Sequence, residues 1–247
     1  MNGDEKARKV HNVFENIAHR YDLMNNLISF GLHKRWKAKT VELARIPLES
    51  ASVLDIGCGT GDYVEIVLTK SKGRVEKVVG VDFSAKMIEI AKQRFAREIA
   101  RGKVELHKAD IMDLSFLPDS RFSLVTAGFI LRNVSDIRTV LRQVFAKLAL
   151  GGAFVSLDLA KPVPLLMRPL SFLYVRLFLP FLANAIAGAK EEYLWLFESL
   201  KTFPTTKELK DVMIEVGFDS VMVKSFGLGV VASHIGFKEK WNGGPVR

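Results

Sequence analysis

Cysteine is almost absent from this sequence, since Cys58 is the one cysteine among 247 residues. A single thiol excludes an internal disulfide framework and a metal site built from several cysteines, and it suits a reducing cytoplasm. Cys58 lies within a glycine-rich turn, where its small size accounts for it better than a nucleophilic role would.

Long uninterrupted apolar runs are also absent. The charged stretch Met1–Arg20 has no apolar core of the kind found in secretion signals, so we expect a cytoplasmic protein. Lys161–Gly188 is rich in apolar residues, but Arg168, Arg176 and Pro180 interrupt it. Because a membrane-spanning helix needs roughly 20 predominantly apolar residues, we expect an insertion that lies over the sheet or in a membrane interface. Helices folded onto the core are the alternative.

Acidic residues are outnumbered, with 27 Asp and Glu against 36 Lys and Arg, which gives a formal net charge of +9 and a pI near 9.6. This balance favours anionic partners, either nucleic acid or a membrane surface, and a lysine-rich solvated surface is the alternative. The charge is scattered and no nucleic-acid recognition motif is present. We therefore expect no nucleic-acid partner, and a peripheral contact with the inner face of the cytoplasmic membrane.

A glycine-rich turn follows directly after a short apolar strand. The strand is predicted over Ala51–Ile56, and Gly57, Gly59 and Gly61 precede a helical pattern. Exposed amides at a helix start can bind a polar or anionic ligand. The spacing G-x-G-x-G is shorter than the dinucleotide fingerprint, and Asp55 stands just before it. This arrangement favours a nucleoside that carries a charged amino-acid tail.

Two further acids end the next two predicted strands. Asp82 closes Lys77–Asp82, and Asp110 follows Val104–Ala109. An acid at the end of the second strand can accept hydrogen bonds from both ribose hydroxyls. The acid after the third strand can accept one from an adenine amino group, while a neighbouring backbone amide donates to the ring.

The alternation of strands and helices predicts the fold. Phe122–Phe129 is almost wholly apolar, which indicates a central strand, and Gly151–Gly152 is predicted to turn the chain into a fifth strand, Ala153–Leu159. The last two strands, Phe218–Phe226 and Val230–Phe237, are expected to form a hairpin. The pattern predicts an α/β, doubly wound, Rossmann-like sheet with a C-terminal antiparallel hairpin and a helical cap or insertion.

Polar residues mark helix starts and the end of the central strand. Ser84 is predicted to cap a helix that runs to about Arg101, and Thr205 or Thr206 to cap another. Just beyond the central strand, Arg132 and the neighbouring Asn133 stand where open α/β sheets place their ligands. The alternative is that Arg132 only pairs with a local acid.

Several segments spread along nearly the whole chain form a recognisable series: Val13–Ala18, Tyr21–Asn25, Ser29–His33, Trp36–Lys37, Leu131–Val134, Glu198–Leu200 with Phe203–Pro204, and Gly229–His234. In sequence and in order they resemble segments of the menaquinone and ubiquinone biosynthesis C-methyltransferases, which are class I methyltransferases that use S-adenosyl-L-methionine. The resemblance implies S-adenosyl-L-methionine as cofactor and a prenylated quinol as substrate. It favours C-methylation of demethylmenaquinol to menaquinol.

Several alternatives stay open beside this interpretation. A 2-methoxy-6-polyprenyl-benzoquinol or another small molecule is the alternative acceptor, and an NAD-dependent oxidoreductase or a basic nucleic-acid-binding protein is the alternative from another class. The oligomeric state is open, with a homodimer among the expected assemblies. We expect a single methyltransferase domain with a helical cap (1–48), a cofactor-binding core (49–160), an apolar helical insertion (161–203) and a closing helix with the hairpin (204–240).

The expected site combines the glycine turn with the strand ends. Cofactor contacts are expected at Asp55, Gly57, Gly59, Thr60, Asp82, Phe83, Asp110, Ile111 and Gly128. The resemblance implies catalytic, ring-facing roles for Tyr21, Arg132 and Asn133. Gly128 stands where the family usually has serine, so one contact is expected to fall to the backbone. Ile130 replaces a glycine beside the ring site.

Carbon methylation requires an electron-rich ring carbon held in line with the methyl group. A quinol hydroxyl, with a pKa of roughly 10 like that of tyrosine, makes its ring strongly nucleophilic once it ionises. Arginine stays charged and accepts no proton, so Arg132 is expected to stabilise the developing phenolate while Asn133 orients the oxygen. His33 and His234 are candidate proton acceptors, each with a structural role as the alternative.

Overall fold

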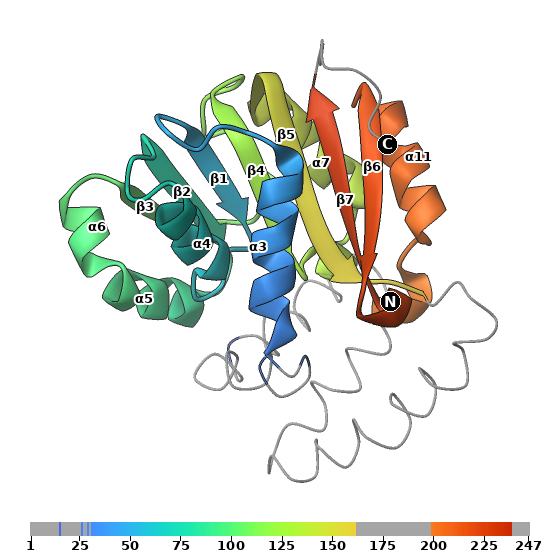
Figure 1. The fold of residues 1–247 in the computed structure, drawn as a ribbon, viewed down its shortest axis with the longest axis horizontal. Coiled ribbons are helices and arrows are strands. Elements are labelled where there is room, and N and C mark those ends of the chain that lie inside the picture. The colour runs from blue at the N-terminus through green and yellow to red at the C-terminus, as the bar shows by residue number, and fades with distance from the viewer. Residues whose placement is uncertain (1–14, 16–25, 27–28, 30, 162–198, 239–247) are drawn as a thin grey trace, which may run out of the picture.

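The computed structural model describes residues 15, 26, 29, 31–161 and 199–238, and its strands form one seven-stranded sheet of order β3-β2-β1-β4-β5-β7-β6 (Figure 1). The strands are β1 (Ser52–Ile56), β2 (Lys77–Asp82), β3 (Val104–Lys108), β4 (Phe122–Gly128), β5 (Leu148–Leu159), β6 (Ser220–Phe226) and β7 (Val231–Lys238). The first five are parallel, and β7 pairs antiparallel with both β5 and β6. The predicted doubly wound sheet with its closing hairpin is confirmed, and β4 is central.

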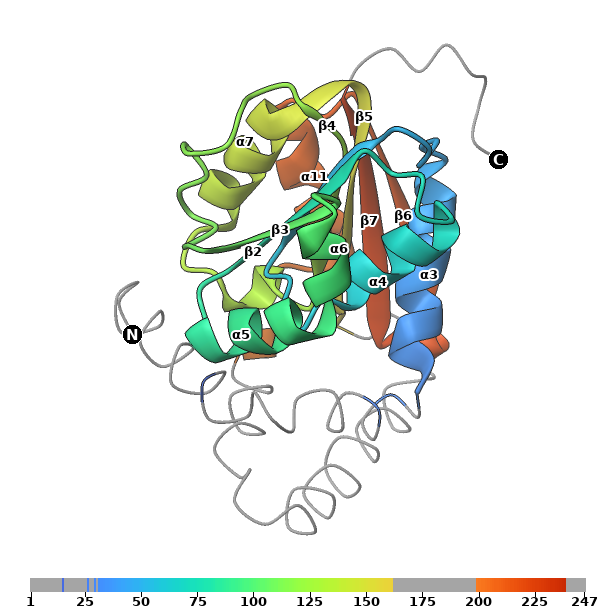
Figure 2. The same cartoon turned by 90° about the vertical axis from the view of Figure 1, so that its left-hand side faces the viewer.

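Helices cover both faces of the sheet (Figure 2). They are α3 (Leu32–Ala44), α4 (Asp62–Lys70), α5 (Ala85–Arg94), α6 (Ala96–Ala100), α7 (Ile137–Lys147) and α11 (Thr206–Val216), with short 3-10 helices η2 (Leu131–Asn133) and η4 (Gly227–Gly229). Val41 of α3, Val64 of α4 and Ala91 of α5 are buried in one apolar cluster, whereas Val144 of α7 and Met213 of α11 are buried in the other. The core therefore has two layers, one on each face.

The predicted capping residues begin two of these helices. The Ser84 hydroxyl accepts a hydrogen bond from the Met87 amide at 3.2 Å and starts α5. Thr205, rather than Thr206, caps α11, and its hydroxyl and the Glu208 carboxylate form a reciprocal capping box. Each cap satisfies amides that the first helical turn leaves without a backbone partner.

Two predicted boundaries are wrong. The helix expected to reach Arg101 breaks at Phe95, whose φ of −110° leaves the helical region. The Phe95 ring fills the space beside Gly61, where a Cβ would lie 2.3 Å from its Cε2 atom, so packing against the glycine turn accounts for the break. Gly151 and Gly152 lie inside β5 rather than before it, at a register shift against β4.

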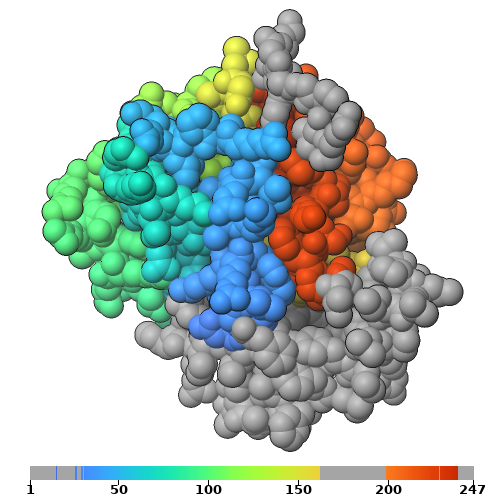
Figure 3. Space-filling view, viewed as in Figure 1, coloured from blue at the N-terminus to red at the C-terminus, as the bar shows by residue number. Residues whose placement is uncertain are grey.

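Helix α3 precedes the sheet in sequence and packs across one of its faces. It contacts α4, β5 and β7, and in Figure 3 it lies between α4 and the closing hairpin. Tyr21 and residues 162–198 of the expected apolar insertion lie outside the described residues. Among the residues that the structure does describe, no helix combines the length and apolar character needed to cross a bilayer.

Candidate active site

The turn between β1 and α4 requires glycine at each of its three glycine positions. Gly57, Gly59 and Gly61 have φ values of 62°, 55° and 93°, in the left-handed region that favours glycine. A Cβ on Gly57 would also lie 2.6 Å from Cγ1 of Ile130. The turn therefore keeps bare backbone at the carboxyl end of β1, as its spacing predicts.

Two pockets meet at this turn. The first is lined by Lys37, Asp55, Gly57, Cys58, Thr60, Asp62, Tyr63 and Gly128. The second is lined by Gly57, Gly59, Asp82, Phe83, Met87, Gly128, Phe129 and Ile130. Gly57 and Gly128 line both pockets, so the two pockets adjoin at the glycine turn. Most of the expected cofactor contacts therefore lie together here.

Asp55 is a buried carboxyl with an unsatisfied oxygen. Its Oδ1 atom accepts a hydrogen bond from the Thr126 hydroxyl at 2.7 Å, but its Oδ2 atom has no partner among the described residues. Burial raises the pKa of Asp55 to about 7, although Thr126 and the Lys37 charge oppose the rise. A cationic group in the first pocket would supply the missing donor.

Asp82 has backbone partners for both of its oxygens. The Gly59 amide donates to Oδ2 and the Ser84 amide donates to Oδ1, each at 2.9 Å. Burial raises the pKa of Asp82 to about 6 despite these donors. The two amides fix the carboxylate at the second pocket, and a carboxylate oxygen can accept more than one hydrogen bond. This orientation suits the diol of a ribose.

Asp110 and Ile111 line neither pocket. Asp110 is exposed beyond β3, and its Oδ1 atom accepts a hydrogen bond from the Met112 amide at 2.9 Å. The Ile111 side chain is buried in the apolar core, so any contact with a ligand would use its backbone. The adjacent Ala109 amide donates to the backbone oxygen of Asp82 at 3.0 Å, which keeps this loop beside the second pocket.

Gly128 leaves no room for a larger side chain. A Cβ there would lie 2.9 Å from Cε2 of Tyr63 and 3.1 Å from Cε of Lys37. Both neighbours are buried, and a serine at this position would push against them. The prediction that position 128 offers only backbone to a ligand therefore has a steric reason.

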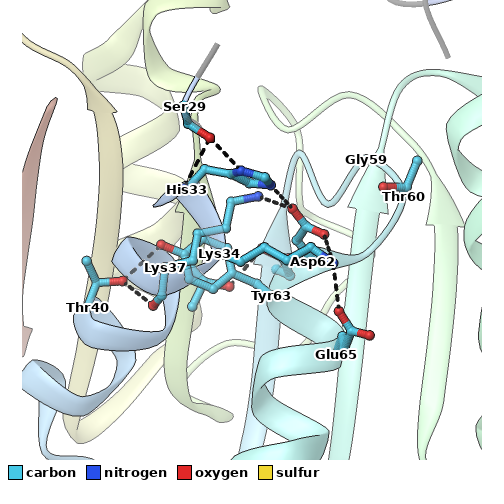
Figure 4. A network of polar contacts seen from close by, with 12 residues as sticks. Ser29, His33, Lys34, Lys37, Thr40, Gly59, Thr60, Asp62, Tyr63 and Glu65 are labelled. Atoms are coloured by element: carbon cyan, nitrogen blue, oxygen red, sulfur yellow. Dashed lines mark hydrogen bonds and ion pairs between the residues drawn. The ribbon is translucent and has the colours of Figure 1, made fainter. Parts of the chain in front are cut away.

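A polar network links α3 to the start of α4 (Figure 4). Lys37 Nζ donates to Asp62 Oδ2 at 2.9 Å, and His33 Nε2 lies 3.5 Å from the same oxygen. The His33 ring also bonds Ser29 through Nδ1, at 2.8 Å. Burial alone would raise the pKa of Asp62, but the Lys37 ammonium and His33 hold it well below its usual range. Sequence reasoning missed this network, although it noted the segment that supplies it.

Arg132 and Asn133 lie on η2, and both are buried. The Arg132 guanidinium forms an ion pair with Asp158 of β5, an acid 26 positions away in the sequence. Arg132 Nη1 and Asn133 Nδ2 both donate to the backbone oxygen of Phe129, at 3.1 and 3.2 Å. Arg132 Nε has no partner among the described residues and remains an available donor.

Phe129 connects the two sides of the site. Its φ of 60° is unusual for a residue with a side chain and directs its carbonyl toward Arg132 and Asn133. Lys37 Nζ and Arg132 Cζ each lie 5.8 Å from the centroid of the Phe129 ring. The ring is therefore near both the cation of the first pocket and the cation beyond β4.

The two candidate proton acceptors differ in their surroundings. His234 Nε2 donates to the backbone oxygen of Thr206 at 2.9 Å, and burial lowers the pKa of this histidine. These contacts indicate a structural role for His234. His33 is buried in the network of Figure 4, with Ser29 on the side away from Asp62. No His, Cys, Asp and Glu cluster suited to a metal ion occurs among the described residues.

Comparison with known proteins identifies the family. The model of the ubiE/COQ5 methyltransferase family matches residues 2–238. The chain belongs to this family. It is 40% identical over 233 residues to the demethylmenaquinone methyltransferase of Oceanobacillus iheyensis, covering 94% of this chain and 96% of that protein. The Bacillus licheniformis protein of the same name is also 40% identical, with coverage of 94% and 98%.

Solved structures support the same fold. A SAM-dependent methyltransferase from Thermotoga maritima has a TM-score of 0.61 at 20% identity, and the match covers 93% of this chain and 100% of that protein. One from Aquifex aeolicus has a TM-score of 0.56 at 16% identity, with coverage of 81% and 88%. The chain therefore has the fold of the class I methyltransferases. As a member of the ubiE/COQ5 methyltransferase family, it uses S-adenosyl-L-methionine. Methyl transfer replaces the oxidoreductase alternative.

We expect Asp55→Asn to stabilise the ligand-free protein at high pH. The folded chain holds the Asp55 pKa near 7, so Asp55 contributes stability below its unfolded pKa and loses that contribution as the pH rises through 7. The gain in unfolding free energy from the substitution should be larger at pH 8 than at pH 5, by on the order of 2 kcal/mol. Urea denaturation at both pH values measures it. A gain that is equal at the two values would contradict the burial of an unsatisfied carboxyl.

Proposed function

We propose that this protein transfers a methyl group from S-adenosyl-L-methionine to a ring carbon of demethylmenaquinol, which gives menaquinol. The observation that supports it most is the pair of buried donors, Arg132 and Asn133, held by the Phe129 carbonyl beside the second pocket. Relatives that match nearly the whole chain are named for demethylmenaquinone methylation.

We assign the cofactor to the two pockets because their residues suit its charged and polar groups. It supplies an electrophilic methyl on a positively charged sulfur, together with the ammonium and carboxylate of an amino acid. We assign its ribose to Asp82, with Gly59 and Phe83 nearby, and its amino-acid end to Asp55 and Thr60. The unsatisfied Oδ2 atom of Asp55 is the observation that supports this direction, because the cofactor brings a cation to it. The bare backbone of Gly57 and Gly128 lies between the two ends, and Asp110 and Ile111 are assigned to the adenine.

Arg132 stabilises the negative charge that develops on the quinol oxygen. Its pairing with Asp158 fixes the guanidinium while leaving Nε unpartnered among the described residues. Asn133 shares the Phe129 carbonyl with it and is assigned to orient the oxygen. One well-placed donor to a developing oxyanion contributes about 100- to 1,000-fold in rate. Tyr21 is kept as a ring-facing residue, and the proton leaves through water or a base, for which His33 is the candidate.

The acceptor is tested with purified protein, S-adenosyl-L-methionine and chemically reduced demethylmenaquinone of short prenyl chain. We expect mass spectrometry to show one added methyl group on the naphthoquinone ring. Reduced 2-methoxy-6-polyprenyl-benzoquinone under the same conditions is the matched comparison. Methylation of the benzoquinol alone would replace the proposed substrate, and methylation of neither would refute quinol methylation.

Substitution of Arg132 should lower turnover without weakening cofactor binding. We expect Arg132→Ala to reduce kcat by about 100- to 1,000-fold. The affinity for S-adenosylhomocysteine, measured by calorimetry, should change less than about twofold, because Arg132 is assigned to the quinol and not to the cofactor. Arg138→Ala removes an exposed arginine that pairs with Glu215 and serves as control.

Arg132→Ala leaves Asp158 buried without its cation, so the fold has to be checked by circular dichroism. Arg132→Lys keeps a charge beside Asp158 and serves as the second variant, again with reduced turnover because the guanidinium fork is lost. Equal losses of turnover and cofactor affinity, or unchanged turnover in both variants, would remove Arg132 from the catalytic machinery.

A peripheral site on the inner face of the cytoplasmic membrane is proposed as well, since a prenylated quinol resides in the bilayer. The net charge of +9 supports attraction to anionic lipid. The full chain should float with vesicles that contain anionic lipid and separate from them at high salt, because surface charges are then screened. Protein that stays at the bottom of the gradient at low salt would refute membrane docking. We also propose that the protein forms a homodimer.

A further inference from the structure

Lys37 is a buried ammonium group at the wall of the first pocket. It is only 5% exposed, and it is the basic residue among those that line this pocket. A lysine is rarely buried without a charge partner, because its ammonium loses hydration. Lys37 has such a partner in Asp62 at 2.9 Å, yet the pocket that it lines also holds the unsatisfied carboxyl of Asp55.

The pair with Asp62 does not account for the position of Lys37 by itself. Two further cations lie near Asp62, since Arg94 Nη1 is 3.6 Å and Lys34 Nζ 3.8 Å from its oxygens, and His33 Nε2 lies 3.5 Å away. One carboxylate thus faces several bases, and the Lys34 and Arg94 groups are shared with Glu65. Asp62 thus has cationic neighbours besides Lys37.

The first pocket therefore presents opposite charges to one ligand. The unsatisfied oxygen of Asp55 calls for a cationic donor, and the Lys37 ammonium can donate to an anion. A free amino acid end carries both groups on a single carbon. The lysine stem passes beside Gly128, where a Cβ would lie 3.1 Å from Lys37 Cε, so the bare backbone of β4 makes room for it.

We propose that Lys37 binds the carboxylate of the cofactor's amino-acid end, while Asp55 binds its ammonium. This assignment rests on the proposed placement of the cofactor. Helix α3 is then part of the cofactor site. The Lys37–Asp62 contact, which joins α3 to α4, also positions the ammonium for the ligand. The ligand carboxylate accepts a further hydrogen bond from this ammonium.

Calorimetry with two ligands separates this role from a structural one. S-adenosyl-L-methionine and its decarboxylated form differ by one carboxylate, and neither is consumed when no quinol is present. The wild-type protein should bind the decarboxylated form about 10- to 100-fold more weakly, as expected for a hydrogen bond to a charged group. Lys37→Met should weaken the binding of S-adenosyl-L-methionine by a similar factor, while the affinity for the decarboxylated form changes by less than about threefold. The variant should therefore no longer discriminate between the two ligands.

The matched control is Lys39→Met on the same helix, which removes an exposed lysine paired with Glu42 and should leave the discrimination intact. Lys37→Arg keeps a cation beside Asp62 and should retain most of the discrimination between the two ligands. This variant provides a test if Lys37→Met does not fold. Equal weakening of both ligands, or no discrimination by the wild-type protein, overturns the proposal. Because these titrations contain no quinol, a failure of quinol methylation would leave their outcome unaffected.

Discussion

Burial of carboxyl groups beside bare glycine backbone is the constraint on which this site depends. Asp55, Asp62 and Asp82 are each at most 5% exposed, and the fold stabilises each one differently. Asp82 receives two backbone amides, Asp62 pairs with the Lys37 ammonium and lies near the Lys34 ammonium and the Arg94 guanidinium, and Asp55 receives a single hydroxyl. Their pKa values differ accordingly, because that of Asp62 lies far below the usual range whereas those of Asp82 and Asp55 are raised to about 6 and about 7. The glycine turn thus retains one carboxyl that a cationic ligand can stabilise.

The site is electrostatically divided along β4. On one side of Phe129, buried acids line the pockets at the glycine turn and suit a ligand with positive charge. On the other side, η2 carries the guanidinium of Arg132. Pairing with Asp158 keeps that guanidinium fixed, and the left-handed backbone of Phe129 directs its carbonyl to hold both Arg132 and Asn133. Methyl transfer from a cationic sulfur to a phenolate carbon neutralises opposite charges, and this division favours such a reaction.

The sequence predicted those features that local patterns encode. The strand ends with Asp55 and Asp82, the glycine turn and the closing hairpin all depend on residues adjacent in the chain. The Lys37–Asp62 and Arg132–Asp158 pairs join residues 25 and 26 positions apart, and no local pattern specifies them. The break at Phe95 was missed for the same reason, because it follows from packing against Gly61. Distant partners thus set the final geometry of a site whose position short motifs reveal.

A crystal structure of the chain with S-adenosylhomocysteine would show whether one ligand spans both pockets in a defined direction. We expect its ribose hydroxyls on Asp82, its amino-acid end against Asp55 and Lys37, and its sulfur near the backbone of Gly57 and Gly128. A ligand bound in the reverse direction, or away from the glycine turn, would contradict this placement.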